Sequence, residues 1–403
     1  MSSSILLARQ PIFDSKLNTV AYELLYRSPE GLGPATPFNG TEATAQVLLH
    51  AYSSIFQDGK IKTIPAFINF NAEWLYSGNL PSLKPEALVL EILEDVPVTD
   101  ELLDRIENLT KAGYRLALDD FIYDKSWDAA LSNIQVVKID IQQLSPTQLL
   151  QHLHELKQHN VTLLAEKVET HQQFEYCKSL GFKLFQGYFF CHPQLVEGCK
   201  HSASSTTMLH LLAELENSNA SPTSLENIIS KDPDLVIRLL KIVNSARFAI
   251  SREISNISEA IIALGLDELK KWTLLIGVSQ CQSQTNELTR QILIRAKMCE
   301  ILSATYSTKS NNAFLLGILS GIDGLLNMPL DQILEQLALA NEIKTALLTH
   351  EGPLGILLED VKHFMAGEWD DIDHCDDNSN LALAYQQSID WALNTMKELH
   401  SSA

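Results

Sequence analysis

Six side chains with oxygen ligands stand at or near the ends of short apolar runs in the first half of the chain. The clearest run covers residues 116–118 and ends in two adjacent acids. An apolar run without helical spacing predicts a buried strand, and two acids at its end are costly unless a positive charge lies beside them. The six residues are Glu23, Asn69, Glu91, Asp119, Asp120 and Glu166.

The chemistry of these six side chains favours a metal site. They offer only oxygen, without His or Cys, and this donor set suits Mg²⁺ or Mn²⁺ better than zinc. So many carboxylates repel one another, and two metal ions bridged by Asp119 would neutralise them. Lys138 ends another apolar run and would hold the attacking water or stabilise a developing negative charge. Structural ion pairs and helix caps are the alternative, with Lys138 neutralising Asp119 or Asp120.

The runs that carry these residues alternate with helix-like stretches, which predicts an α/β fold with a parallel sheet. A polar group at each carboxyl end is typical of a TIM-like barrel, and about 200 residues is short for that fold, so some outer helices are expected to be trimmed. An open doubly wound sheet is the alternative, but it usually has a glycine-rich first turn. The expected strands cover residues 20–22, 66–68, 88–90, 116–118, 136–137, 163–165 and 184–185.

Composition limits the class of protein. A chain of 403 residues with 45% hydrophobic residues predicts two globular domains. The formal charge of -20 argues against nucleic acid or an anionic membrane as a partner, because those surfaces attract clustered Lys and Arg. The six cysteines form no CxxC pair, and no apolar run is long enough to cross a membrane. We therefore expect a cytoplasmic protein without membrane insertion.

The segments around these residues resemble the EAL-type phosphodiesterases, which hydrolyse cyclic di-GMP. Residues 23–27, Glu-Leu-Leu-Tyr-Arg, stand where the family has Glu-Ala-Leu-x-Arg, and residues 165–169, Ala-Glu-Lys-Val-Glu, resemble Ala-Glu-Gly-Val-Glu. Five further segments resemble the opening QPI, Asn-strand, Leu-Glu-Ile-Thr-Glu, Lys-Ile-Asp and closing Gln-Gly-Tyr motifs: residues 10–14, 68–71, 90–94, 138–140 and 185–193.

The resemblance implies a TIM-like (β/α) barrel over residues 1–200 that opens one phosphodiester of cyclic di-GMP to give linear pGpG. It implies that Lys138 and Glu166 assist the attacking water. Two Mg²⁺ or Mn²⁺ ions would be held by Glu23, Asn69, Glu91, Asp119 and Asp120. The nucleotide site would be lined by Gln10, Arg27, Asp140, Glu169 and Gln186.

One loop departs from the family. In the family, Asp-Asp-Phe is usually followed by Gly-x-Gly-x-Ser-Ser, and residues 122–127 take the place of that loop here. Ile122 and Asp124 replace its two glycines, and their side chains make the same backbone path costly in free energy. Leu93 replaces a Thr that anchors this loop in the family. In the family this loop couples metal binding to dimerisation, so the resemblance implies a possible homodimer. A catalytically degenerate receptor or scaffold is the second hypothesis. A barrel that uses Mg²⁺ to stabilise an enolate fits the acids but not the motifs.

The second half is expected to be all-α. Asp232 and Pro233 predict a helix start, and Ser258 and Gly265 predict the cap and stop of another helix. Residues 201–403 resemble the HDOD domain, and the chain has no His-Asp dipeptide, so the resemblance implies a module that binds a protein partner. Asn244, Ser245 and Arg247 are candidates for that surface or for helix caps. The acidic residues between 368 and 377 predict a solvated loop.

Overall fold

The structure is a computed structural model, and its description covers most of the chain in segments. These are residues 6–27, 64–70, 72–77, 85–94, 96–187, 222–245, 248, 254–280, 286–326, 328–337, 339–372 and 378–401. The chain forms two compact units. One contains Met1–Phe190 and Lys362–Leu383, and the other contains Cys191–Val361 and Ala384–Ala403.

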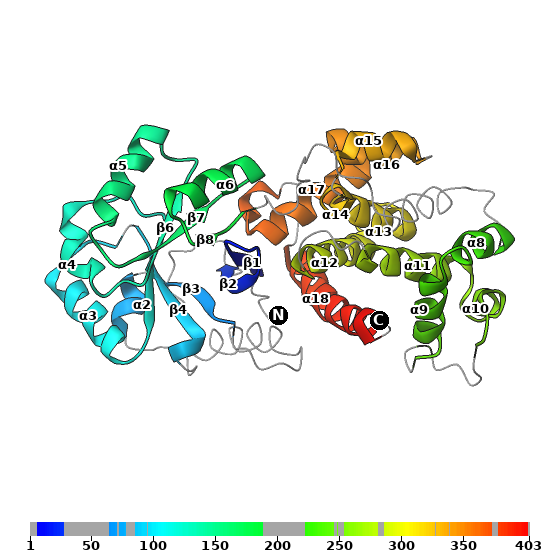
Figure 1. Cartoon of the computed structure of the whole chain (residues 1–403), viewed down its shortest axis with the longest axis horizontal. Helices are drawn as coiled ribbons and strands as arrows, with labels where there is room; N and C mark the ends of the chain where they lie inside the picture. Colours follow the sequence, from blue (N-terminus) through cyan, green and yellow to red (C-terminus); the bar gives the residue numbers. More distant parts are fainter. Residues whose placement is uncertain are drawn as a thin grey trace. The chain divides into compact units, whose positions relative to one another are not determined.

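Eight strands of the first unit close into a barrel, which confirms the predicted fold (Figure 1). The first strand is antiparallel to both of its neighbours, whereas the other strands run parallel to one another. Seven strands were expected, and the first of the eight was missed. The strands are β1 (Leu6–Asp14), β2 (Thr19–Arg27), β3 (Ala66–Phe70), β4 (Leu88–Ile92), β5 (Arg115–Leu118), β6 (Val136–Asp140), β7 (Thr162–Glu166) and β8 (Leu184–Phe185).

An apolar layer inside the barrel supports the polar residues above it. Because side chains two positions apart share one face of a strand, Ala21 lies below Glu23 and Val89 lies below Glu91. The same spacing relates Val136 to Lys138. The buried layer consists of Ile12, Ala21, Phe67, Val89, Ala117, Val136 and Leu164. This layer keeps the polar side chains at the carboxyl end of the barrel.

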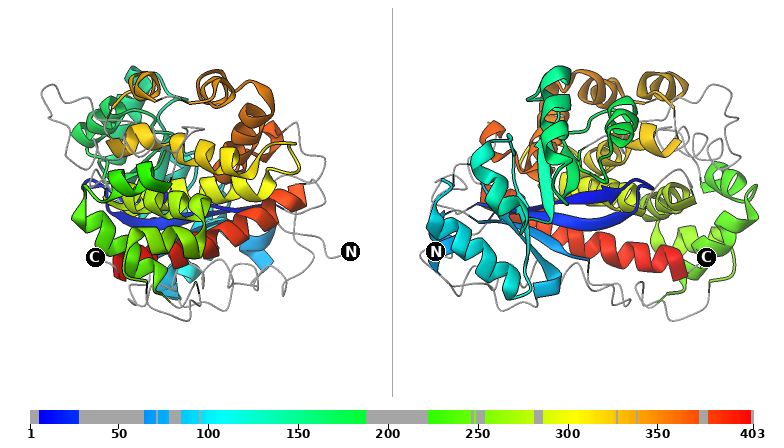
Figure 2. Two further views of the ribbon diagram at one scale, coloured as in Figure 1. Left: turned by 90° about the vertical axis from the view of Figure 1, so that its right-hand side faces the viewer. Right: turned by 60° about the vertical axis from the view of Figure 1, so that its left-hand side comes forward.

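Helices cover the outside of the barrel (Figures 1 and 2). Their starts are specified by local sequence: Ser145 and Thr170 each form a capping box, and Thr99 accepts a hydrogen bond from the backbone of Leu102. Several of these helices are short, as expected for a barrel of this length. They are α2 (Ala72–Ser77), α3 (Asp100–Lys111), α4 (Asp128–Leu131), α5 (Pro146–Leu156) and α6 (His171–Leu180), with the 3₁₀ turns η1 (Pro85–Ala87) and η2 (Lys125–Trp127).

All the elements of secondary structure described in the second unit are helices, as predicted. Asp232 accepts a hydrogen bond from Leu235 N at the start of α9, but the helix that was expected to begin at Ser258 is capped by Asn256. None of the described helices has the length and hydropathy needed to cross a membrane.

The remaining elements are α8 (Pro222–Ile229), α9 (Pro233–Val243), α10 (Ile257–Leu264), α11 (Leu266–Gln280), α12 (Asn286–Leu302), α13 (Ser310–Leu319), α14 (Ile322–Leu326), α15 (Leu330–Gln336), α16 (Asn341–Thr349), α17 (Gly352–Ala366), η4 (Trp369–Asp371) and α18 (Asn378–Ser401).

Candidate metal centre

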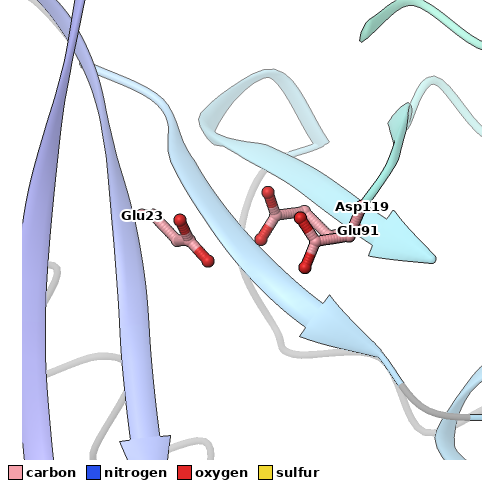
Figure 3. A group of neighbouring side chains, drawn as sticks. All are labelled: Glu23, Glu91 and Asp119. Carbon is pink, nitrogen blue, oxygen red and sulfur yellow. The ribbon is translucent and has the colours of Figure 1, made fainter. Parts of the chain in front are cut away.

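Three of the predicted acids converge inside the barrel at the carboxyl ends of its strands. Glu23 lies on β2, Glu91 lies on β4, and Asp119 directly follows β5. One carboxylate oxygen from each of them lies within 4.8 Å of the others, and Figure 3 shows the three side chains pointing toward one another. The structure therefore brings together groups that are far apart in the sequence into one set of oxygen ligands.

Lys138 is the cation at the centre of this site. Its Nζ lies 2.6 Å from Asp119, 2.8 Å from Glu91, 3.0 Å from Glu166 and 3.2 Å from Glu23, measured to a carboxylate oxygen in each case. The lysine side chain is only 1% exposed. One buried ammonium group therefore compensates part of the charge of four acids.

The pKa directions follow from this arrangement. Burial, together with the neighbouring charge of Glu23, raises the pKa of Glu91 well above its usual range. Burial alone would lower the pKa of Lys138, but the surrounding acids, with Asp119 first, raise it well above its usual range. Burial also raises the pKa of Glu166. The site therefore carries more negative charge than its single central lysine can balance.

The donor set fits a hard divalent cation. Oε2 of Glu91 and Oε2 of Glu166 are buried and accept no hydrogen bond from the described part of the chain. Buried carboxylate oxygens in that state are stabilised by a bound cation, and carboxylate oxygen is the ligand that Mg²⁺ and Mn²⁺ prefer. Asn69 is adjacent, since its Nδ2 donates to Glu23 Oε1 at 3.3 Å.

Two glutamines connect the acids to the wall of the barrel. Gln186 is buried, and its Nε2 donates to Glu23 Oε2 at 2.7 Å and to Gln10 Oε1 at 2.6 Å. Gln10 in turn donates from its Nε2 to the backbone oxygen of Ala366 at 2.6 Å. Sequence alone gave no signal for the last contact, because its partners lie 356 positions apart.

Asp140 lies at the end of β6, where it is buried and paired. Its Oδ1 accepts from the backbone N–H of Gln142 at 2.8 Å, and its Oδ2 lies 2.6 Å from Nζ of Lys167. Lys167 occupies the position of the glycine in the Ala-Glu-Gly-Val-Glu pattern, and the resemblance implies no role for it. Its φ of +52° is in the left-handed region and marks the position as unusual.

The remaining predicted residues are not part of the convergent set. Asp120 is half-buried with a φ of +42°, and it is not one of the three clustered acids. Burial and the neighbouring Asp119 raise its pKa. Glu169 is exposed between β7 and α6. The side chain of Arg27 lies outside the described part of the structure.

The loop that departs from the family pattern is built around its own contacts. Neither Ile122 nor Asp124 has a positive φ, and Asp124 is extended, with its Oδ1 accepting from Ser126 N at 2.8 Å. Trp127 is buried and packs edge-on against Phe121, with ring centroids 6.0 Å apart. The loop borders a cavity of about 300 Å³ beside the acids, lined in part by Leu93, Glu94, Asp119, Asp120, Phe121, Ile122 and Trp127.

One of the candidates in the second unit, Asn244, has a structural role. Asn244 donates from Nδ2 to the backbone oxygen of Ile254 and accepts from its N–H, both at 2.8 Å, so its amide closes a loop. Arg247 lies outside the described residues, as do residues 373–377 of the acidic run. Among the residues that are described, the acidic run contributes nothing to the clustered metal ligands.

Two family models match this chain, the EAL domain over residues 65–193 and the HDOD domain over residues 203–370. YuxH of Bacillus subtilis is 34% identical over 97% of this chain and 99% of that protein. The cyclic di-GMP phosphodiesterase CdgJ of Vibrio cholerae is 33% identical over 91% of this chain and 87% of that protein. Among solved structures, a calcium and cyclic di-GMP complex of Klebsiella pneumoniae BlrP1 is 24% identical over 46% of this chain and 54% of that chain, with a TM-score of 0.38. The chain therefore belongs to the family of proteins that join an EAL domain to an HDOD domain.

Proposed function

We propose that this protein hydrolyses cyclic di-GMP to linear pGpG with the help of two Mg²⁺ or Mn²⁺ ions. The observation that carries the proposal is the convergence of Glu23, Glu91 and Asp119 around Lys138. Family membership supports the choice of substrate, since the relative CdgJ is a cyclic di-GMP phosphodiesterase.

In this proposal the water oxygen adds to phosphorus, the bond between phosphorus and the ribose O3′ breaks, and O3′ takes up a proton from solvent to become the free hydroxyl of pGpG. Divalent ions, when bound, would lower the pKa of the attacking water and balance the charge of the phosphate. Glu166 accepts the proton of the water, and Lys138 holds that water while keeping the acids together. Glu23, Asn69, Glu91, Asp119 and Asp120 are the proposed ligands of the ions.

The nucleotide is proposed to bind along the rim of the barrel. Gln10 and Gln186 belong to the hydrogen-bonded chain that reaches Glu23. Both amides therefore share one network with the metal ligands. Arg27, Asp140 and Glu169 complete the proposed set of substrate-binding residues.

Turnover of cyclic di-GMP by a matched pair of variants tests this proposal. Glu23→Gln keeps the size of the side chain but removes one charged ligand, whereas Glu175→Gln makes the same change on the outer helix α6. We expect Mn²⁺-dependent formation of pGpG by the wild type and by Glu175→Gln, and only background with Glu23→Gln. Equal turnover by both variants would refute the metal role.

A receptor without turnover is the second candidate, and the altered loop at residues 122–127 favours it. The loop adjoins Asp119 and Asp120, so a different path there changes the surroundings of two proposed metal ligands. Calorimetric titration of the protein with cyclic di-GMP in the presence of Ca²⁺ distinguishes the receptor from the enzyme. Tight binding without pGpG formation in Mn²⁺ would support the receptor.

We also propose that residues 201–403 form a module that binds a protein partner, joined to an EAL domain in residues 1–200, in a cytoplasmic protein. The chain contains no His-Asp dipeptide, the pair of ligands that HD enzymes use. A homodimer is the proposed assembly. Light scattering of the full chain with and without Mn²⁺ tests it, and a single mass equal to 45.0 kDa in both conditions would refute it.

A further inference from the structure

We propose that Lys167 is a substrate-binding residue whose ammonium group binds the phosphodiester of the cyclic dinucleotide that is not being cleaved. This inference rests on the proposed function and extends it to a residue with no assigned role. It concerns the recognition of an anionic group outside the metal centre.

The backbone at Lys167 is held in an unusual conformation. Its φ of +52° suits glycine, and a lysine there is disfavoured because its Cβ crowds the backbone. The conformation is fixed from several sides. Gln142 Nε2 donates to the backbone oxygen of Lys167 at 3.0 Å, and Val168 N donates to Gln186 O at 3.0 Å. Backbone strain of this kind persists where the surroundings enforce it, and it clusters at binding and catalytic sites.

The side chain of Lys167 is accessible although its backbone is fixed. The side chain is 57% exposed, and its Nζ lies 2.6 Å from the buried Asp140. It also interacts electrostatically with Asp120 and Glu166. The lysine therefore extends over the rim of the acidic centre, directly after the strand that carries Glu166.

In the described part of the chain, Lys138 and Lys167 both pair with acids of this site. They differ in exposure, and therefore in the groups that each can contact. Lys138 is 1% exposed and is surrounded by four carboxylates. Its ammonium group is therefore committed to the metal centre, where it is proposed to hold the attacking water. Lys167 is on the rim and can exchange its contact with Asp140 for a phosphate oxygen, because Asp140 keeps the N–H of Gln142.

The charge of the substrate favours a further cation on the rim, in addition to the proposed Arg27. Cyclic di-GMP carries two phosphodiesters, each with one negative charge, and the metal centre can take only the one that reacts. The phosphodiester that is not cleaved must then lie near the rim of the barrel, which is rich in acidic side chains. A lysine there offsets the repulsion and donates a charge-assisted hydrogen bond.

Steady-state kinetics of Lys167→Met tests the inference, because methionine keeps the length of the side chain and removes the charge. We expect KM for cyclic di-GMP to rise about tenfold or more, with kcat changed little. Lys167→Arg should retain most of the affinity. Lys178→Met on α6 is the control, since Lys178 pairs with the exposed Glu175 outside the barrel.

Two further measurements separate substrate binding from a structural role. Added NaCl should raise the KM of the wild type more steeply than that of Lys167→Met, because salt screens the lost interaction. The KM for bis(4-nitrophenyl) phosphate, a diester with a single phosphate, should not change in Lys167→Met. Lys167→Gly suits the observed φ and should raise KM for cyclic di-GMP as methionine does, so backbone strain at this position cannot account for the effect.

The outcomes are distinguishable from those of the proposed function. An unchanged KM for cyclic di-GMP in Lys167→Met and Lys167→Gly would overturn the inference while the phosphodiesterase stands. If the wild type binds cyclic di-GMP without turnover, the phosphodiesterase fails, and Kd replaces KM in the same comparison. Absence of both binding and turnover would overturn both.

Discussion

At the scale of single residues, the site is a balance between clustered acids and one buried lysine. Lys138 lies within 3.2 Å of four carboxylates and is almost fully enclosed. Desolvated charges of this kind are tolerated only in mutual contact. Lys138 is therefore needed for the stability of the metal-free fold as well as for the proposed reaction.

Lys138→Met should destabilise the metal-free protein by about 3–5 kcal/mol, because three buried carboxylates and the partly buried Asp119 lose their counter-charge. Mn²⁺ should raise the melting temperature of the variant more than that of the wild type, since the ion supplies the missing positive charge. Thermal unfolding with and without Mn²⁺ measures both effects.

Lys111→Met is the matched control for this experiment. Lys111 pairs with Glu107 on α3, its side chain is 67% exposed, and an ion pair of this type contributes little to stability. Equal melting temperatures of Lys138→Met, Lys111→Met and the wild type would contradict the account of Lys138.

At the scale of elements, the strands were predictable because a polar residue follows an apolar run at each carboxyl end. The first strand was missed because Arg9, Gln10 and Pro11 interrupt its pattern, and proline is unusual inside a sheet. The barrel accepts Pro11 because β8 pairs with β1 only at Phe13 and Asp14.

The helices were less predictable than the strands. Asn256 lies two positions before the predicted cap at Ser258, and both residue types favour a cap, so the sequence alone does not separate them. Residues 310–326 form two helices, α13 and α14, instead of one continuous helix. Their break follows Leu319 in a sequence with no proline to mark it.

An ion-pair cluster between α11 and α12 provides a pH-dependent prediction. Oε1 of Glu300 lies 2.6 Å from Lys271 Nζ, and Oε2 lies 2.6 Å from Lys297 Nζ. Burial alone would raise the pKa of Glu300, but the two lysines lower it below its usual value of 4.5. A lowered carboxyl pKa stabilises the fold above that value, and the stabilisation is lost as the pH falls through the folded pKa.

Glu300→Gln should therefore lower the free energy of unfolding by about 2 kcal/mol at pH 7. The difference from the wild type should shrink as the pH falls below 4.5, where the unfolded glutamate is already protonated. Urea unfolding at pH 7 and at several acidic values measures this. A difference that stays constant across the series would contradict the assignment, and Glu335→Gln, at an exposed acid on α15, is the control.

At the scale of the whole molecule, the barrel unit is discontinuous in sequence. Lys362–Leu383 belongs with the barrel, and the backbone oxygen of Ala366 accepts from Gln10. Gly367 permits the close approach, because its φ is +81° and a Cβ there would overlap with Cδ1 of Leu25. A contact between such distant segments has no signature in the local sequence, so the composition and motifs could not predict it.

Gly367→Ala should weaken this packing by about 1–3 kcal/mol, since alanine is strained at a positive φ and also meets Leu25. Hydrogen exchange should become faster in residues 362–372 and stay unchanged in β4 to β7. Gly352→Ala adds strain at a φ of +76° but meets no atom within 4 Å, which makes it the control. Unchanged exchange in residues 362–372 would contradict the packing account.

The central claim is that the acids inside the barrel hold divalent ions that the hydrolysis requires. The most direct test is to strip the protein of metal, titrate Mn²⁺ back and follow the conversion of cyclic di-GMP to pGpG chromatographically. The account predicts no conversion with the chelator, conversion that rises with Mn²⁺ to saturation, and none with Glu91→Gln at any concentration of the ion. Conversion that persists in the chelator, or survives in Glu91→Gln, would contradict it.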